Sequence, residues 1–361
     1  MAVKKFKVGI IGTGSIGSCH ASSYVELAKE GKCELIACCD LDRKKALAFA
    51  EKYGIPKENV YTKFEKMIEE VKLDCVSVTT WNRSHMAPTV YALDHGINVL
   101  CEKPTAMNTS QALKMKEAAD RSGKILQIGF VRRFGDDAAL AKKLIDAGEI
   151  GELYYAKAFY MRQRGCPGGW FADKSYSGGG PLIDLGVHVI DLIRYLTGGP
   201  KAVEVFGTTN RGLMSEGMDV GAWNPSESNG RVFKKDVEDI TTAMIRFDNG
   251  MVLNFEATFN LNMPEEGRNG VEIFGKKNGV VVTDRTRIAR PLPEKSKVKI
   301  PEEPQQFGFT KGLKDEADEF LRTCRTGKQT ITTPEDGVEV MRIIDAIYKS
   351  AKLGHSVTIK R

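Results

Sequence analysis

Two acidic residues flank a histidine at helical spacing in an otherwise apolar segment. Asp184, His188 and Asp191 occupy positions i, i+4 and i+7 after the run Gly178-Gly179-Gly180-Pro181. On an α-helix this spacing places all three on one face, and Pro181 suits a first helical turn. A carboxylate and an imidazole in an otherwise apolar helix need a polar partner, and the hydroxyl of a substrate is a suitable one. The alternatives are a structural Asp–His hydrogen bond and a metal site, for which two aspartates and one histidine are thin support.

A lysine follows another apolar run at the point where a predicted strand ends. The segment Cys101-Glu102-Lys103-Pro104 comes directly after Leu100. Ligands of open α/β sheets bind beyond the carboxyl ends of the strands, so we expect Lys103 to lie beside the bound ligand. Pro104 restricts the backbone and indicates an unusual peptide geometry. The alternative is an ordinary surface pair of Glu102 and Lys103.

A glycine-rich turn near the N-terminus has the pattern of a dinucleotide-binding loop. It consists of Gly12, Thr13, Gly14, Ser15, Ile16 and Gly17, between a predicted strand and a predicted helix. The first glycine permits the tight turn, the second lets a pyrophosphate approach the backbone, and the third lets the helix pack closely. Asp40 ends the next predicted strand, about 20 residues further on, where a carboxylate binds the adenosine ribose and favours NAD. Arg43 keeps NADP open, and the structural alternative is that Asp40 caps the following helix.

Short apolar runs alternate with amphipathic segments as far as residue 133. Runs rich in Val, Ile and Cys predict strands, and apolar residues at helical spacing predict helices. The predicted strands are 7–11, 34–39, 75–79, 98–101 and 125–130, and the predicted helices are 15–30, 43–53, 64–70, 86–95 and 110–122. This order predicts a doubly wound parallel sheet of the Rossmann type in a first domain, residues 1–133.

Beyond residue 133 the pattern changes, and after residue 200 several strands follow one another without helices between them. A helix is predicted at 138–147, a strand at 153–160 and a strongly apolar helix at 181–196. Extended runs follow at 202–209, 241–247, 252–259, 270–274 and 280–283, then helices at 314–325 and 335–351 and a last strand at 356–359. The segments 211–236 and 291–309 have the composition of loops. We therefore expect a second domain, residues 134–361, of the α+β class on a large, mostly antiparallel sheet.

Composition excludes several classes of protein. The chain has 361 residues, 42% hydrophobic and 28% charged, enough to bury two cores. Its net charge of +6 is spread over scattered lysines, which argues against a nucleic-acid partner. The eight cysteines form no CxxC pair, so we expect buried thiols and neither disulfides nor zinc ligands. Neither a signal peptide nor an apolar run of membrane-spanning length is recognised, so we expect a cytoplasmic protein without a membrane partner.

In combination these motifs resemble those of the Gfo/Idh/MocA oxidoreductases, a family named for glucose-fructose oxidoreductase and inositol dehydrogenase. The resemblance covers nearly the whole chain. It rests on the ordered set Gly12 to Gly17, Thr80-Trp81-Asn82 with His85, Glu102-Lys103-Pro104, Gln127-Ile128-Gly129-Phe130 with Arg133-Phe134, and Asp184 with His188. Trp81 stands where the family usually has proline, a variation also found in inositol dehydrogenase-like members.

The resemblance implies an intact active site. The family's catalytic lysine, aspartate and histidine correspond to Lys103, Asp184 and His188. His188 would be the general base, Lys103 would stabilise the reacting oxygen, and Asp184 would orient the substrate and hold His188. The implied cofactor contacts are Gly12, Thr13, Gly14, Ser15, Ile16, Gly17, Asp40, Leu41, Arg43, Thr80, Trp81, Asn82, His85, Glu102 and Lys103. The implied substrate contacts are Lys103, Arg133, Arg164, Trp170, Asp184 and His188, although Trp170 could equally anchor its loop to the core.

The implied function is an NAD(P)-dependent dehydrogenase that acts on a secondary hydroxyl of a sugar or cyclitol. NAD is the expected cofactor, and no metal is expected. Two other functions stay open, namely a redox-neutral glycosidase that uses NAD transiently and a non-catalytic sugar or NAD sensor. Family members commonly pair through the open face of the second sheet, so we expect a homodimer or a homotetramer.

Overall fold

The computed structural model describes residues 5–213, 232–329 and 331–361, and the chain divides into two compact units. Unit 1 comprises 1–131 with 309–338, and unit 2 comprises 132–308 with 339–361. The single boundary expected near residue 133 does not describe 309–338, because helix α9 (Phe309–Thr326) packs on α1 (Ser15–Lys29) of unit 1. Asp318 of α9 forms an ion pair with Lys32, just after α1, at 2.7 Å. Local sequence patterns do not predict this contact, because α9 and α1 are far apart in the sequence.

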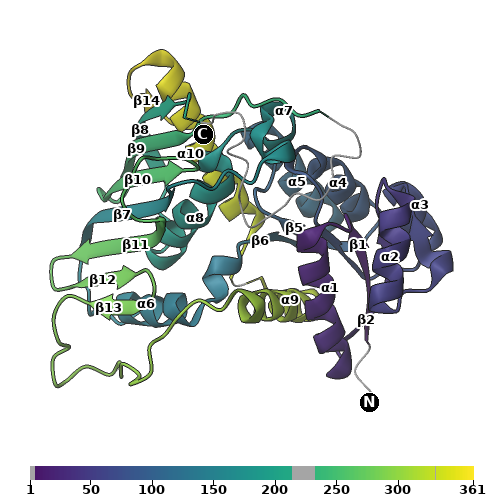
Figure 1. Cartoon of the computed structure of the whole chain (residues 1–361). Helices are drawn as coiled ribbons and strands as arrows, with labels where there is room; N and C mark the ends of the chain where they lie inside the picture. The colour runs from purple at the N-terminus through teal and green to yellow at the C-terminus, as the bar shows by residue number, and fades with distance from the viewer. Residues whose placement is uncertain (1–4, 214–231, 330) are drawn as a thin grey trace. The chain divides into compact units, whose positions relative to one another are not determined.

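Unit 1 is built on a six-stranded sheet in the order β3-β2-β1-β4-β5-β6, with every pair parallel. Its strands are β1 (Phe6–Ile11), β2 (Cys33–Cys39), β3 (Val60–Tyr61), β4 (Cys75–Val78), β5 (Asn98–Glu102) and β6 (Leu126–Gly129). Its remaining helices are α2 (Arg43–Tyr53), α3 (Phe64–Glu70), α4 (Met86–Asp94) and α5 (Thr109–Ser122) (Figure 1). The predicted doubly wound parallel fold is confirmed. The strand order reverses between β1 and β4, where folds of this kind bind ligands.

The strands of unit 1 are apolar because helices cover them. Val8, Ile10, Cys38 and Leu100 are fully buried in one hydrophobic cluster. All eight cysteines are free thiols, and six of them are buried, as expected from their apolar neighbours. Within the described ranges, no helix combines the length and apolar character that a membrane span requires.

Unit 2 is built on an eight-stranded sheet in the order β13-β12-β11-β7-β10-β9-β8-β14. Its strands are β7 (Leu153–Arg162), β8 (Ala202–Asn210), β9 (Ile240–Phe247), β10 (Val252–Thr258), β11 (Gly267–Gly275), β12 (Gly279–Val282), β13 (Thr286–Ile288) and β14 (Val357–Thr358). The prediction of a mostly antiparallel sheet is confirmed, and among the strands that the structure describes β7 and β10 form the one parallel pair. That pair is possible because β7 and β10 are far apart in sequence, so their connection need not be a hairpin. Of the predicted loop 211–236, residues 214–231 lie outside the described part of the chain.

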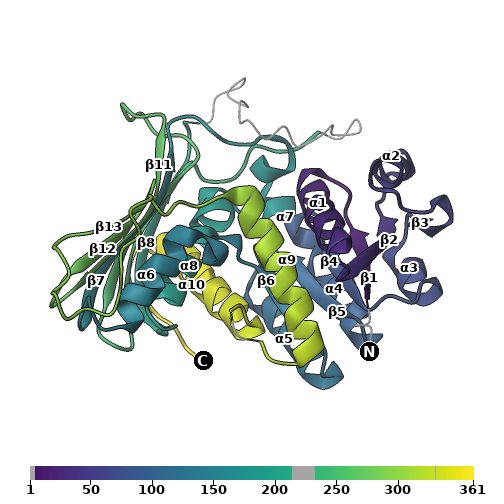
Figure 2. The same cartoon turned by 90° about the horizontal axis from the view of Figure 1, so that it is seen from below.

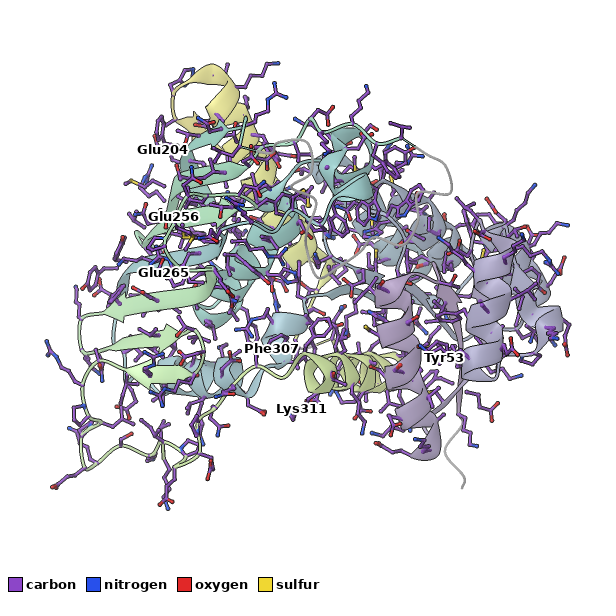
Figure 3. All side chains as sticks on the ribbon, in the orientation of Figure 1. Tyr53, Glu204, Glu256, Glu265, Phe307 and Lys311 are labelled. Carbon is purple, nitrogen blue, oxygen red and sulfur yellow. The ribbon has the colours of Figure 1, made fainter. Side chains whose placement is uncertain are left out.

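One face of this sheet carries helices and the other carries exposed side chains. Figure 2 shows α6 (Asp136–Asp146), α8 (Val187–Leu196) and α10 (Pro334–Leu353) on the same side of the strands. The strands alternate buried and outward residues, and Phe206 of β8 pairs with Met244 of β9 on the outward side. These two side chains are 46% and 55% exposed. Figure 3 labels Glu204 and Glu256, which alternate onto the same side, so this face mixes apolar and charged groups.

Candidate active site

The three glycines of the turn after β1 have three different environments. Gly12 has a φ of +101°, and a Cβ there would lie 2.7 Å from the carbonyl carbon of Thr79. A Cβ on Gly17 would overlap the backbone oxygen of Gly12. A Cβ on Gly14 would meet no heavy atom within 4 Å. Gly12 and Gly17 are therefore required by the turn itself, whereas Gly14 leaves open space beside the backbone.

The start of helix α1 has the properties of an anion site. Gly14 is its N-cap, no side chain caps it, and its first turn contains no acidic residue. The N–H groups of a first helical turn lack partners within the helix and carry a partial positive charge. Open space at Gly14 and uncapped N–H groups together fit the pyrophosphate of a dinucleotide.

Asp40 connects the end of β2 to the glycine turn. Its carboxylate accepts hydrogen bonds from the backbone N–H and the hydroxyl of Thr13, at 2.9 and 3.0 Å, and from the N–H of Asp42 at 2.9 Å. The alternative that Asp40 caps α2 is wrong, because Asp42 accepts from the first N–H groups of that helix. The side chain of Leu41 is 77% exposed, and Arg43 is exposed as well. Asp40 is half-buried, at the rim of the turn it stabilises.

The turns after β4 and β5 are joined by one buried histidine. His85 is fully buried, with Nδ1 2.7 Å from the carbonyl oxygen of Pro104 and Nε2 3.0 Å from that of Thr80. Burial is the main cause that lowers the pKa of His85 below its usual value. The peptide bond between Lys103 and Pro104 is cis, which confirms the unusual geometry expected there. Four predicted cofactor contacts lie on the turn after β4, namely Thr80, half-buried Trp81, buried Asn82 and His85.

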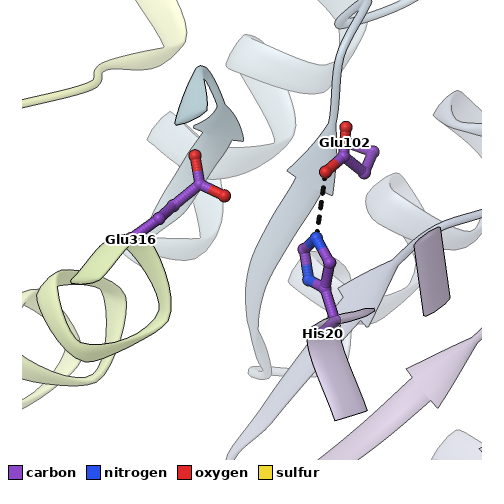
Figure 4. Close-up of side chains that lie close together, drawn as sticks. All are labelled: His20, Glu102 and Glu316. Atoms are coloured by element: carbon purple, nitrogen blue, oxygen red, sulfur yellow. Dashed lines mark hydrogen bonds and ion pairs between the residues drawn. The ribbon is translucent and has the colours of Figure 1, made fainter. Parts of the chain in front are cut away.

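The carboxylate of Glu102 points into the interior of unit 1. It lies 2.9 Å from Nε2 of His20, on α1, and it accepts the N–H of Lys103 at 3.0 Å. Figure 4 shows this pair with Glu316 of α9 nearby. One ligand atom from each of His20, Glu102 and Glu316 lies within 4.8 Å of the others, so this is one group that could hold a metal ion among the described residues. The expectation of no metal stays a prediction.

The segment that carries Asp184 and His188 begins with a π-helical turn, Leu182–Gly186, and continues as α8. The predicted helix over 181–196 is confirmed as an α-helix from Val187 to Leu196, and its first turn is π-helical. Gly186 lies against the sheet, and a Cβ there would be 2.6 Å from the ring of Phe255 on β10. Single π-helical turns of this kind occur frequently at functional sites.

Asp184 and His188 lie on this segment, whereas Asp191 has a structural partner. Asp184 is buried and His188 half-buried, and the ring of Tyr160 on β7 lies 6.3 Å from the imidazole, centre to centre. Asp191 accepts two hydrogen bonds from the guanidinium of Arg133, at 2.9 and 2.6 Å, and both side chains are almost fully buried. Asp191 therefore has a structural role as the partner of Arg133. The substrate contact expected of Arg133 stays a prediction, and its guanidinium is already held by Asp191.

The run of three glycines has a steric explanation. A Cβ on Gly179 would overlap the hydroxyl of Tyr348, and a Cβ on Gly180 would overlap the backbone oxygen of Glu238. The buried carboxylate of Glu238 accepts from the hydroxyl of Tyr348 at 2.8 Å and from the N–H of Leu182 at 3.3 Å. Burial raises the pKa of Glu238. This pair therefore fixes the start of the helical segment that carries Asp184 and His188. The glycine run signals close packing, but no local pattern in the sequence points to Glu238 and Tyr348 as the partners.

Two further predicted substrate contacts lie on the loop after β7. Arg164 is exposed and its backbone pairs with that of Asn260. Trp170 is half-buried and stacks on Phe171, with ring centres 3.8 Å apart. Stacking of this kind is consistent with an anchor for the loop and with a platform for a sugar ring, so both interpretations of Trp170 stay open.

Comparison with known families assigns both parts of the chain. Residues 6–130 match the model of an oxidoreductase family with an NAD-binding Rossmann fold, and residues 138–281 match the GFO/IDH/MocA C-terminal domain. The chain belongs to the GFO/IDH/MocA oxidoreductase family. It is an oxidoreductase with an NAD-binding domain, as the resemblance in sequence implied.

Several named dehydrogenases are similar to the chain over nearly its whole length. It is 32% identical to D-glucoside 3-dehydrogenase of Escherichia coli over 99% of both chains. It is 28% identical to the NAD-dependent scyllo-inositol 2-dehydrogenase of Bacillus subtilis, over 98% of this chain and 96% of that one. The structure of levoglucosan dehydrogenase with NADH and L-sorbose matches with a TM-score of 0.82 and 25% identity, over 99% of this chain and 100% of that one. The relatives are thus dehydrogenases of sugars and inositols.

Proposed function

We propose that this protein is an NAD-dependent dehydrogenase that oxidises a secondary hydroxyl of a sugar or cyclitol, or reduces the matching ketone. The observation that carries the proposal is that Lys103, Asp184 and His188 are all present in a chain related over its whole length to D-glucoside 3-dehydrogenase. A non-catalytic sensor would not need to retain this set. A glucoside is accordingly the first substrate to test.

The residues of unit 1 suit NAD. Gly14 and the start of α1 would hold the pyrophosphate, since the backbone there is open and uncapped. Asp40 would accept a hydrogen bond from the adenosine ribose, and the exposed side chain of Leu41 would cover part of the adenine. Exposed Arg43 leaves NADP as the alternative cofactor. When bound, NAD supplies the acceptor for the hydride that leaves the substrate carbon.

The chain's own residues would handle the proton and the charge. His188 would take the proton of the substrate hydroxyl as general base, and Asp184 would orient the imidazole and the substrate. The ammonium group of Lys103 would donate to the reacting oxygen and stabilise the charge that develops there. The side chain of His188 is half-buried.

A spectrophotometric panel tests the reaction class. The protein is incubated with NAD or NADP and with alkyl glucosides, levoglucosan, free aldoses and inositols, and the absorbance of reduced nicotinamide is followed. NADH formation with one of these confirms the proposal. Cleavage of a glycoside that needs NAD but accumulates no NADH would instead establish the redox-neutral glycosidase, and binding of NAD and sugar without turnover of any kind would establish the sensor.

Variants then test the assigned residues. His188→Ala and Lys103→Ala should each lower turnover at least about a hundredfold, whereas the exposed controls His355→Ala and Lys299→Ala should not. If His188 and Lys103 serve one transition state, the double variant should be little worse than the poorer single variant. Multiplication of the two losses, or wild-type turnover in either folded single variant, would contradict the roles.

Self-association is the remaining proposal about partners. The outward face of the unit 2 sheet exposes Phe206 and Met244, and Arg246 pairs with Glu204 beside them at 3.0 Å. A face of this mixed character suits a symmetric contact between two copies. Light scattering of the wild type and of Met244→Glu compares the masses in solution, and a monomeric wild type would refute the expected homodimer or homotetramer.

A further inference from the structure

A buried chain of hydrogen bonds runs through unit 1 and ends at the backbone of Lys103. The hydroxyl of Tyr24 lies 2.8 Å from that of Ser77, which lies 3.3 Å from Nδ1 of His20. Nε2 of His20 lies 2.9 Å from Oε1 of Glu102, and Oε2 of Glu102 accepts the N–H of Lys103 at 3.0 Å. The chain therefore connects helix α1, which follows the glycine turn, with strands β4 and β5.

Every side chain in this series is withdrawn from solvent. Tyr24 and Ser77 are fully buried, and His20 and Glu102 are 2% and 6% exposed. Polar groups at such depth destabilise a protein unless they are paired, so this set is held together by its own bonds. The backbone makes room for it at Gly129 of β6, where a Cβ would lie 3.2 Å from Cα and Oε1 of Glu102.

The direction of the two bonds at Glu102 follows from the chemistry of a carboxylate. An ionised carboxylate only accepts, so the ring nitrogen of His20 that faces Glu102 donates. The second carboxylate oxygen is used by the N–H of Lys103. Glu316 approaches the pair from α9 and adds a second acidic group beside the same imidazole (Figure 4). With both oxygens engaged, rotation of the Glu102 carboxylate would break one bond or the other, so His20 fixes Glu102 and Glu102 fixes the backbone of Lys103.

We propose that His20 and Glu102 are positioning residues for Lys103, which set the direction in which its side chain leaves the turn after β5. The proposal rests on the role given to Lys103 above. Neither side chain needs to touch the substrate, because the effect passes through the backbone N–H of Lys103. The geometry also explains why a histidine lies on the buried side of helix α1, together with apolar residues such as Ala21 and Leu27.

Three variants separate positioning from general stability. His20→Leu removes the donor to Glu102, and His20→Gln keeps an amide donor in nearly the same place. Leu27→Val is the matched control, because Leu27 is fully buried two turns further along the same helix. Each variant is compared for kcat, KM, the NAD dissociation constant, and hydrogen exchange at the amide of Lys103, which reports the bond to Glu102 directly.

The proposal expects faster exchange at the Lys103 amide in His20→Leu, together with a loss in kcat of about ten- to a hundredfold, since small misplacements of a reacting group have effects of that size. The NAD dissociation constant should stay within about threefold, and His20→Gln should recover most of both signals. Equal exchange or equal kcat in His20→Leu and Leu27→Val would overturn it. Lys103→Met distinguishes the two proposals: wild-type turnover in that variant would refute the role of Lys103, while the exchange comparison would still decide whether His20 orders its backbone.

Discussion

Alanine substitutions at two neighbouring glycines should separate the stability of the cofactor turn from its ability to bind NAD. Gly14 and Gly17 both have backbone angles that other residues adopt, so the comparison depends on space alone. A methyl group on Gly14 meets no atom within 4 Å, whereas one on Gly17 overlaps the carbonyl oxygen of Gly12 and lies 3.1 Å from the hydroxyl of Thr79. The two variants are therefore expected to fail in different ways.

The sizes of the two effects follow from the contacts. At Gly17 the overlap falls well below the usual carbon–oxygen separation of about 3.3 Å, and overpacking of a rigid backbone costs about 1–3 kcal/mol. Because the atom that is overlapped belongs to the backbone, we use the upper end of this range, about 3 kcal/mol. Alanine is favoured over glycine within a helix by about 1 kcal/mol, so we expect a net loss of about 2 kcal/mol in the free energy of unfolding. At Gly14 a gain of about 0.4–1 kcal/mol from the unfolded chain is partly offset by a slightly poorer cap. The unliganded Gly14→Ala variant should thus match the wild type within about 0.5 kcal/mol.

For the binding of NAD, we expect the larger effect from the variant that leaves stability unchanged, Gly14→Ala. The added methyl group of Gly14→Ala occupies the space that a pyrophosphate needs, so its dissociation constant for NAD should rise at least about tenfold, or about 1.4 kcal/mol. Urea unfolding of the unliganded proteins and calorimetric titration with NAD measure the two quantities. Wild-type affinity in Gly14→Ala, or equal destabilisation in Gly14→Ala and Gly17→Ala, would refute the account of this turn.

Two further predictions concern ion pairs. Asp191→Asn leaves the buried guanidinium of Arg133 without its counter-charge, so urea unfolding should show a loss of about 3–5 kcal/mol. A raised KM with unchanged stability would instead support a substrate contact for Arg133. The ammonium groups of Lys314 and, in second place, Lys32 donate hydrogen bonds to Glu30 and lower the pKa of its carboxyl group from 4.5 to about 2. The contribution of the ionised carboxylate to stability is therefore complete above pH 4.5 and is lost as the pH falls toward about 2. Between those pH values the midpoint temperature of thermal unfolding should fall less steeply with pH in Glu30→Gln than in the wild type. The difference should be largest at low salt, because the ion pair with Lys314 is exposed. The same dependence on pH in both proteins would contradict this role of Glu30.

Most of the fold could be predicted because its signals are local. The glycine turn, the alternation of strands and helices as far as β6, and the change to successive strands afterwards each depend on residues a few positions apart. The misses are also instructive. The strand β3 has two residues and β13 has three, too few for a periodic pattern. The cap of α2 is Asp42 and not Asp40, two residues earlier, and the choice between these two aspartates depends on the backbone geometry at the start of the helix.

The sequence allows the residues of the candidate site to be predicted, but not the hydrogen bonds that hold them in place. Lys103 and His188 stand out because their types are unusual at the end of an apolar strand and within an apolar helix. Nothing near His20 in the sequence indicates that it meets Glu102, and nothing near Glu238 indicates that it meets Tyr348. These partners lie on different elements, so only the packing of those elements brings them together.

The amino-acid sequence by itself determined the order of the two folds, the dinucleotide-binding turn and the residues able to carry out chemistry, because each is encoded within a short stretch of chain. Tertiary structure alone decided that α9 returns to unit 1, that β7 and β10 run parallel, and that Asp191 holds Arg133. It also decided that the carboxylate of Glu102 faces His20. The physical reason is the same in each case: a buried polar group or a strand edge must find a partner, and which partner is within reach depends on how distant segments pack.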